Sequence, residues 1–218
     1  MSFASVRAVL FDLDGTLVHT HIDFPAMKRT VLELVSGHGL DPAPYAELDV
    51  LSAIQAACAA LERPEPFRSG AEAALEEIEL AACEGAYAAE GAAETLDWLR
   101  SRGIGVGIVT RNSRKAVERV LAGLPLPYEV LLTRADTPRV KPDPAHLLLA
   151  LERLGAEPDR AVMVGDHRMD VTGGKSAGMR TLGILTPGRP ADYFDPVAPD
   201  GVIRRLAELR SWIYPSSS

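Results

Sequence analysis

Two acidic residues, Asp12 and Asp14, follow a short apolar run near the start of the sequence and are the first candidates for chemistry. The run, AVLF, does not alternate with polar residues, which is typical of a strand buried on both faces of a parallel sheet. In extended backbone, residues two positions apart point to the same side, and Gly15 then permits a sharp turn. Carboxylates at the carboxyl end of a parallel strand lie where α/β sheets bind ligands. Because they repel each other, we expect them to bind a cation, most simply Mg²⁺ held by oxygen ligands.

Three more polar clusters occur later in the sequence, each after an apolar run of strand type. They are Thr110-Arg111-Asn112, Lys141-Pro142-Asp143-Pro144 and Gly165-Asp166-His167-Arg168-Met169-Asp170. If the apolar runs are parallel strands, these clusters gather at one edge of the sheet. The negative charge of a phosphoryl group needs a cation and hydrogen-bond donors. The clusters offer a suitable set of groups, namely acids that could bind a metal, one hydroxyl, one lysine and a turn of small residues.

Strands and helices alternate along most of the chain, which predicts an α/β fold with a parallel sheet and right-handed crossovers. The predicted strands are residues 4–11, Ile104–Val109, Glu129–Leu132, Ala161–Val164 and Thr181–Leu185. The predicted helices of this part are Ala92–Arg102, a helix capped by Ser113 that ends at Leu121, Pro144–Leu154, Val171–Ala177 and Val202–Trp212.

The segment from residue 18 to residue 87 has a different character, because it lacks strand-type clusters and is rich in alanine, leucine and glutamate. Its pattern predicts helices over Pro25–Val35, Tyr45–Leu61 and Ala71–Cys83, the last with Ser69 as its N-cap. We therefore predict two domains. Residues 1–17 and 88–218 form an α/β core, and residues 18–87 form an inserted α-helical domain.

The bulk composition restricts the classes of protein. The chain has 218 residues, of which 47% are hydrophobic, enough for a sizeable core. The net charge of −7 and the lack of a basic run argue against a nucleic-acid partner. No apolar run approaches the ~20 residues of a membrane span, and no signal peptide is evident, so we expect no membrane partner and a cytoplasmic location. Cys58 and Cys83 lie in alanine-rich stretches without metal-ligand spacing and are interpreted as core residues of a reducing compartment.

The four polar clusters, in their order along the chain, resemble the four motifs of the haloacid dehalogenase-like hydrolase superfamily. The first motif is Phe11-Asp12-Leu13-Asp14-Gly15-Thr16, and the resemblance covers residues 4–16 and 88–188. It implies a Rossmann-like parallel sheet with residues 18–87 inserted as an α-helical cap. Such a cap would exclude water during the reaction and select the substrate.

The resemblance also implies a role for each matching residue. Asp12 is similar to the nucleophile that attacks phosphorus and forms an aspartyl-phosphate. Asp14 is similar to the general acid that protonates the leaving alcohol and then acts as the base that activates water. By the same resemblance, Thr110 would donate its hydroxyl to the phosphate, and Lys141 would stabilise the negative charge of the nucleophile and the phosphate.

The metal ligands implied by the resemblance are Asp12, the backbone carbonyl of Asp14, Asp166 and Asp170. Asp166 would bind Mg²⁺ directly. Asp170 would support the metal site, directly or through water, or is only an acidic residue at a helix N-terminus. His146 stands at a predicted helix start and is interpreted as structural.

Several polar residues near these motifs allow two interpretations. Arg111 and Asn112 either contact the phosphate or belong to a solvated loop. His167 is interpreted as a loop residue near the site. His19 and His21, in the stretch that leads into the helical segment, either reach the substrate or solvate a hinge.

Asp14 indicates which reaction the family resemblance implies. A halide leaves without a proton, whereas an alcohol needs a proton donor, so Asp14 favours hydrolysis of phosphate monoesters. The layout is most similar to phosphoglycolate phosphatase-like enzymes, acting as a monomer or homodimer on a small-molecule phosphate ester. One alternative is a phosphomutase of the β-phosphoglucomutase type, for which Lys28, His19 and His21 are the nearby candidates. Another is a non-catalytic binding protein, although a binding protein has no need of a general acid.

Overall fold

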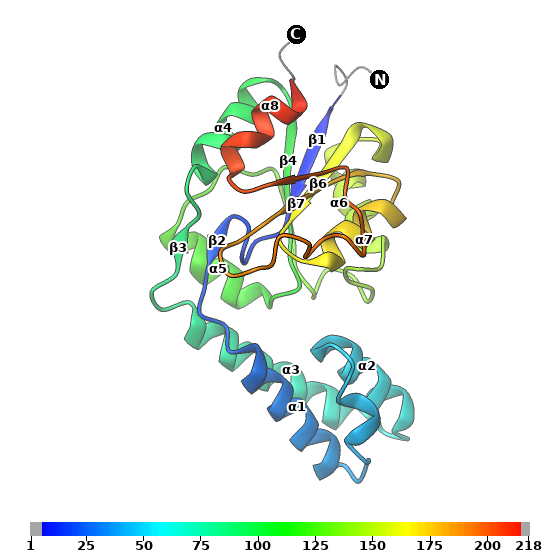
Figure 1. Ribbon diagram of the computed structural model, residues 1–218. Coiled ribbons are helices and arrows are strands. Elements are labelled where there is room, and N and C mark those ends of the chain that lie inside the picture. The colour runs from blue at the N-terminus through cyan, green and yellow to red at the C-terminus, as the bar shows by residue number, and fades with distance from the viewer. Residues whose placement is uncertain (1–5, 215–218) are drawn as a thin grey trace. The chain divides into compact units, whose positions relative to one another are not determined.

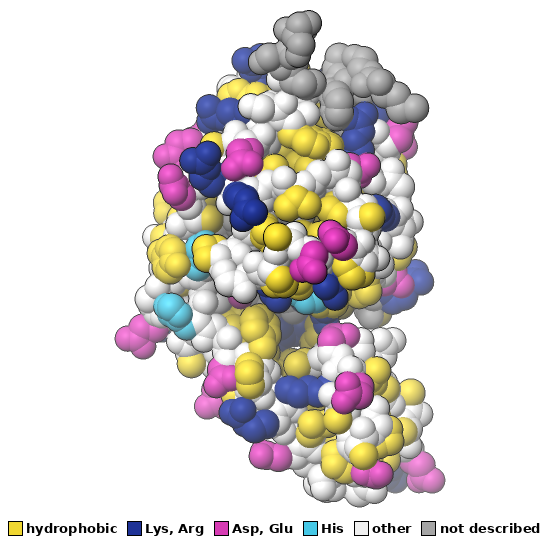
Figure 2. All heavy atoms as spheres, viewed as in Figure 1, with side chains coloured by type: hydrophobic (Ala, Val, Ile, Leu, Met, Phe, Trp, Pro, Cys, Tyr) yellow, Lys and Arg dark blue, Asp and Glu magenta, His cyan; other side chains and the backbone are white. Residues whose placement is uncertain are grey.

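The computed structural model describes residues 6–214, which form two compact units (Figure 1). One unit contains the chain up to Thr20 and from Ala86 onward, and the other contains His21–Gly85. The first two residues of the predicted strand 4–11 lie outside the described residues. On the face shown in Figure 2, acidic and basic side chains are interspersed.

A six-stranded parallel sheet forms the centre of the first unit. Its strand order is β5-β4-β1-β6-β7-β8, and every neighbouring pair is parallel. The strands are β1 (Ala8–Phe11), β4 (Gly105–Val109), β5 (Val130–Leu132), β6 (Ala161–Gly165), β7 (Arg180–Ile184) and β8 (Gly201–Ile203). Phe11 lies opposite Ile108 on one side and Val164 on the other, so β1, β4 and β6 end at the same level. The α/β fold predicted from the alternation of strands and helices is confirmed.

Helices cover both faces of this sheet (Figure 1). α4 (Ala92–Ser101), α5 (Arg114–Gly123) and α8 (Leu209–Ile213) lie on one face, and α6 (Ala145–Leu154) and α7 (Arg168–Ser176) lie on the other. Residues of β1 are fully buried, as expected of a strand covered on both faces. The Ser113 hydroxyl accepts a hydrogen bond from the backbone N–H of Ala116 and caps α5 as predicted.

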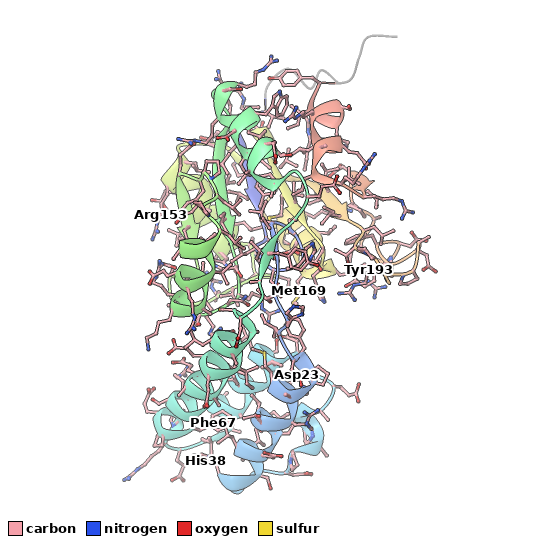
Figure 3. The ribbon with its side chains drawn as sticks, turned by 90° about the vertical axis from the view of Figure 1, so that its left-hand side faces the viewer. Asp23, His38, Phe67, Arg153, Met169 and Tyr193 are labelled. Atoms are coloured by element: carbon pink, nitrogen blue, oxygen red, sulfur yellow. The ribbon has the colours of Figure 1, made fainter. Side chains whose placement is uncertain are left out.

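The second unit is helical. It contains α1 (Phe24–Gly37), the 3₁₀ turn η1 (Ala43–Tyr45), α2 (Val50–Ala60) and α3 (Pro64–Ala82), which pack around a shared apolar cluster. Phe67 lies at its centre, and its ring meets the ring of His38 edge-on at 5.3 Å (Figure 3). In the first unit, β2 (Val18–His19) and β3 (Tyr87–Ala88) pair as an antiparallel ribbon where the chain leaves and returns.

Two sequence predictions about secondary structure were wrong. Ser69 lies inside α3 rather than at its N-cap, because Pro64 occupies the first turn, where its fixed φ and missing N–H are tolerated. The predicted helix Val202–Trp212 is instead the strand β8, the 3₁₀ turn η3 (Leu206–Glu208) and α8. β8 has only three residues and forms by pairing with β7, a tertiary contact that overrides the local apolar spacing. Another 3₁₀ turn, η2 (Pro158–Arg160), precedes β6.

His146 is fully buried in the first turn of α6, and neither ring nitrogen makes a hydrogen bond of good geometry with residues 6–214. Burial, assisted by the positive charge of Lys141, lowers the pKa of His146 from its ordinary value of 6.5 to about 3. The unfolded chain therefore binds a proton below pH 6.5 that the folded chain does not bind until about pH 3. The contribution of His146 to the free energy of unfolding is therefore complete above pH 6.5 and is lost as the pH falls from 6.5 toward 3.

Replacement of His146 by leucine should remove this pH dependence. Between pH 7 and pH 5, the wild-type free energy of unfolding should fall about 2 kcal/mol more than that of His146→Leu. Urea unfolding at both pH values measures the difference. The matched variant His38→Leu, at an exposed position after α1, should show the wild-type pH dependence. Parallel pH profiles for wild type and His146→Leu would contradict the assignment.

Candidate active site

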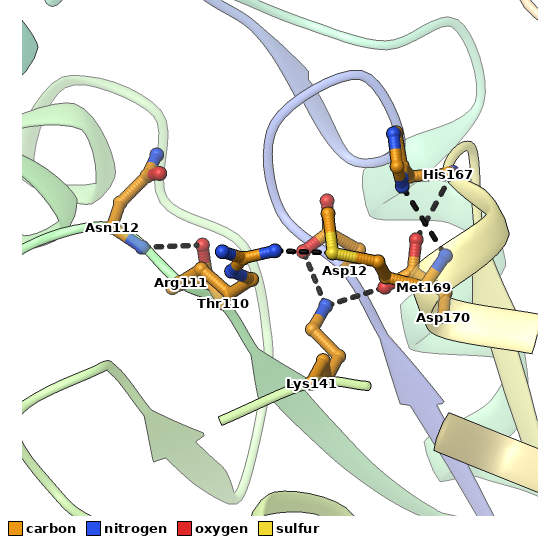
Figure 4. A network of polar contacts seen from close by, with 8 residues as sticks. All are labelled: Asp12, Thr110, Arg111, Asn112, Lys141, His167, Met169 and Asp170. Atoms are coloured by element: carbon orange, nitrogen blue, oxygen red, sulfur yellow. Dashed lines mark hydrogen bonds and ion pairs between the residues drawn. The ribbon is translucent and has the colours of Figure 1, made fainter. Parts of the chain in front are cut away.

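Polar residues from each of the four predicted clusters meet at the carboxyl edge of the parallel sheet (Figure 4). Asp12 follows β1, Thr110 follows β4, and Asp166 follows β6. The backbone N–H of Asp12 donates to the carbonyl of Val164 at 2.9 Å, which fixes the end of β1 against β6. The level ends of the three strands therefore place these side chains together.

Lys141 is the positive charge of the site. Its side chain is 1% exposed, and its ammonium donates to Oδ1 of Asp12 and to Oδ1 of Asp170, each at 2.6 Å. Burial opposes the charged form, but the charges and hydrogen bonds of Asp12 and Asp170 prevail and raise the pKa of Lys141. The ammonium is therefore charged at neutral pH and joins two carboxylates that come from different parts of the chain.

Asp12, Asp166 and Asp170 each place a carboxylate oxygen within 4.8 Å of the others. Burial raises the pKa of Asp12 to about 7 against the opposing charge of Lys141, and burial with neighbouring carboxylates raises that of Asp166 to about 8. One lysine thus leaves this group with uncompensated negative charge once it is ionised. Three oxygen donors with a deficit of positive charge fit a hard divalent cation such as Mg²⁺.

Asp14 lies on the turn that follows β1. Its Oδ1 accepts hydrogen bonds from the backbone N–H and the hydroxyl of Thr20, at 2.9 and 2.7 Å. Gly15 has φ of +83°, and a Cβ there would lie 2.6 Å from the Asp166 carboxylate, so only glycine fits. Asp14 is not part of the three-carboxylate group, and its second oxygen is left for other partners.

The loop after β4 holds Thr110, which is buried, and the half-buried Arg111 and Asn112. The backbone N–H of Asn112 donates to the Thr110 hydroxyl oxygen at 3.3 Å. The Arg111 guanidinium reaches across the site and contacts the sulfur of Met169 at the start of α7 (Figure 4). Arg111 therefore lies over the site rather than in a detached solvated loop.

Asp170 takes part in two arrangements. Its Oδ2 accepts the backbone N–H of His167 at 3.1 Å, while Nδ1 of His167 accepts the N–H of Met169 at 3.2 Å, a reciprocal cap at the start of α7. Its Oδ1 binds Lys141. Asp170 thus lies at a helix N-terminus, one of the two alternatives left by the sequence, and it also binds Lys141, which the sequence did not predict. Its support of a metal site stays a prediction. His167 is a helix cap, which sequence reasoning did not predict.

A network that positions the Lys141 loop was also missed. Oδ2 of Asp136 accepts hydrogen bonds from the backbone N–H and the hydroxyl of Thr133, at 2.7 and 2.9 Å, and forms an ion pair with Arg114 at 2.6 Å. Although burial opposes ionisation, these donors lower the pKa of Asp136. The signal in the sequence that could have predicted this network is an acid, Asp136, three residues after a threonine, Thr133, at the end of a strand.

Comparison with known proteins shows the family. The sequence profile of the haloacid dehalogenase-like hydrolases matches residues 6–178, most of the chain. The chain belongs to this family. It is 33% identical to pyrophosphatase PpaX of Bacillus velezensis, covering 96% of this chain and 97% of that protein.

Solved structures agree with this assignment of the haloacid dehalogenase-like fold. A family hydrolase from Deinococcus radiodurans, solved with bound phosphate and sodium, is 30% identical, with a TM-score of 0.65 and 96% of each chain covered. A predicted phosphoglycolate phosphatase from Haemophilus somnus has a TM-score of 0.63 at 22% identity, covering 95% of this chain and 98% of that one, and shares the fold. The chain is thus a hydrolase of the phosphatase type. Among residues 6–214, no helix combines the length and apolar character needed to cross a membrane.

Proposed function

We propose that this protein is a Mg²⁺-dependent phosphatase that hydrolyses small phosphate monoesters through an aspartyl-phosphate on Asp12. The observation that carries the proposal is the buried group formed by Asp12, Lys141, Asp166 and Asp170. A structural salt bridge needs one acid and one base, whereas three acids around one lysine suit binding of a further cation together with a phosphoryl group.

Asp12 is the nucleophile in this proposal. Lys141 holds Oδ1 of Asp12, which leaves Oδ2 to attack phosphorus. The new bond joins Oδ2 to phosphorus, and the bond between phosphorus and the leaving oxygen breaks. A water molecule then attacks phosphorus, the bond to Asp12 breaks, and inorganic phosphate leaves with the Asp12 carboxylate restored. The Thr110 hydroxyl and the Lys141 ammonium stabilise negative charge on the phosphoryl oxygens.

Asp12, Asp166, the backbone carbonyl of Asp14 and, directly or through water, Asp170 are the proposed ligands of Mg²⁺. When bound, the ion offsets charge on the phosphoryl group and on the ionised carboxylates. Asp170 also keeps Lys141 in place through its 2.6 Å ion pair.

Asp14 is the proposed acid and base. The two donors from Thr20 occupy Oδ1, so Oδ2 carries the proton that passes to the leaving oxygen and later accepts a proton from water. Asp14→Asn should lower kcat/KM for ethyl phosphate by about 10²- to 10⁴-fold and for p-nitrophenyl phosphate much less, because nitrophenolate leaves without a proton. Equal losses for both substrates, measured in parallel assays, would count against this role.

Hydrolysis of inorganic pyrophosphate is a second candidate function. It is favoured by the full-length similarity to pyrophosphatase PpaX at 31–33% identity. The same residues serve it, with phosphate as the leaving group in place of an alcohol.

The function is tested by phosphate release from pyrophosphate, phosphoglycolate, sugar phosphates, nucleotides and p-nitrophenyl phosphate, with Mg²⁺ and with EDTA. Release that requires Mg²⁺ supports the proposal, and the order of rates names the preferred substrate. Interconversion of sugar phosphates faster than phosphate release would support a phosphomutase instead. Absence of both reactions, with Mg²⁺ bound, would support a binding role.

We further propose residues 18–87 as the α-helical cap that selects the substrate.

A further inference from the structure

Two guanidinium groups lie over one aromatic ring of the loop between β7 and β8, one from that loop and one from α7. The Cζ atoms of Arg189 and Arg168 lie 4.4 and 4.7 Å from the centroid of the Tyr193 ring. Nε of Arg168, at the start of α7, also donates to the Tyr193 carbonyl at 2.7 Å. Figure 3 shows Tyr193 on this loop. Stacking on an aromatic face orients a guanidinium group and restricts its motion.

Tyr193 is anchored next to the active site. It is 8% exposed, and its ring meets the ring of Phe194 at 4.9 Å and the ring of His167 at 6.4 Å. His167 directly follows Asp166 and caps α7. The Tyr193 ring thus links Arg189, which stacks on it, to the segment that carries His167 and Asp166.

The charges in this region are arranged for an anion. Two guanidinium groups held against one ring repel each other, and a negative group near them removes that repulsion. Arg189 is exposed and has no ion pair among residues 6–214. Arg111 brings a further positive charge to the start of α7 through its contact with Met169. Lys141 already supplies a cation for the transferred phosphoryl group, so Arg189 can bind another anion.

We propose that Arg189, stacked on Tyr193 beside Arg168, binds a second anionic group on the part of the substrate that leaves. This inference rests on the proposed phosphatase function and narrows its substrates to phosphate esters or anhydrides that carry a further phosphate or carboxylate. Arginine suits this role because its planar group can form two parallel hydrogen bonds to either anion.

The test compares substrates that differ in the leaving part. Pyrophosphate and phosphoglycolate carry a second anion, one a phosphate and the other a carboxylate, and ethyl phosphate carries none. Arg189→Gln should lower kcat/KM for at least one of the anionic substrates about 10- to 100-fold more than for ethyl phosphate, mainly through KM. The substrate with the larger loss identifies the anion. Arg189→Lys should keep part of the preference, and Arg204→Gln, at an exposed site after β8, should keep all of it. Equal losses for all three substrates, or no loss, would overturn the proposal.

A binding measurement separates this inference from the proposed function. In the Asp12→Asn background and with Mg²⁺ present, calorimetry compares pyrophosphate, phosphoglycolate and orthophosphate with and without Arg189→Gln. Weaker binding of pyrophosphate or phosphoglycolate by about tenfold or more, with a smaller change for orthophosphate, supports the subsite even if the wild type releases no phosphate. Unchanged binding of both overturns the subsite even if the phosphatase activity is confirmed.

Discussion

Asp12→Asn should lower kcat by at least about 10⁴-fold for every substrate, since the amide cannot form the acyl phosphate. The fold should survive. Burial raises the pKa of Asp12 to about 7 from its ordinary 3.8, so the ionised carboxylate is less favourable in the folded chain than in the unfolded chain. This destabilisation grows as pH rises from about 4 to about 7 and keeps its full size at higher pH. A neutral side chain of the same shape removes it, and Lys141 keeps a carboxylate partner because its ion pair with Asp170 remains.

The measurements for Asp12→Asn are single-turnover kinetics and urea unfolding in EDTA at pH 8. The free energy of unfolding should equal or exceed the wild-type value. The matched control is Asp97→Asn, an exposed acid on α4 that should keep both activity and stability. Substantial Mg²⁺-dependent turnover by Asp12→Asn would exclude the covalent mechanism, and a large loss of stability would contradict the raised pKa.

Lys141→Met should produce the largest loss of stability. Its ammonium is the partner of two buried or partly buried carboxylates, each 2.6 Å away. Removing one member of a buried ion pair leaves unpaired charge and costs about 3–5 kcal/mol. The free energy of unfolding in EDTA at pH 8 should fall by about that amount, and kcat/KM should fall about 10³-fold because the phosphoryl charge loses its partner.

A second substitution tests the reason for that loss. In Lys141→Met with Asp170→Asn, one of the unpaired charges is absent, so part of the lost stability should return although activity should not. Lys175→Met is the matched control, because the partners of its ammonium among residues 6–214 are the carbonyls of Val197 and Ala198 at the surface. It should change stability by less than about 1 kcal/mol. If Lys141→Met unfolds no more easily than this control, the buried ion pairs do not stabilise the fold.

The positions of the candidate site residues could be predicted because they follow strands. Apolar runs ending in Asp12, Thr110 and Asp166 specify parallel strands, and parallel strands end at one edge. The same argument put the Lys141 cluster at this edge, but it did not predict the pairing of Lys141 with Asp12, because a loop separates Lys141 from the predicted strand Glu129–Leu132. The resemblance to a family indicated it. The roles proposed for these residues are still to be tested by experiment.

Sequence patterns did not predict the residues that act through hydrogen bonds with the backbone of loops. Thr20 binds Asp14, Asp136 binds Thr133, and His167 caps α7, each through hydrogen bonds to or from backbone groups. Such bonds depend on the local path of a loop, which apolar periodicity does not encode. β8 was missed for a related reason, because a three-residue edge strand is specified by its neighbour β7 more than by its own residues.

The most direct test of the account is chemical trapping of the intermediate. The protein is mixed with Mg²⁺ and its preferred substrate, quenched during turnover and treated with borohydride, which reduces an acyl phosphate to an alcohol. Peptide mass spectrometry then examines the segment from Ala8 to Thr16. The account predicts homoserine at position 12 when Mg²⁺ is present and unmodified Asp12 in EDTA. Unmodified Asp12 during rapid turnover under conditions in which the intermediate should accumulate, or reduction at another acid, would contradict it.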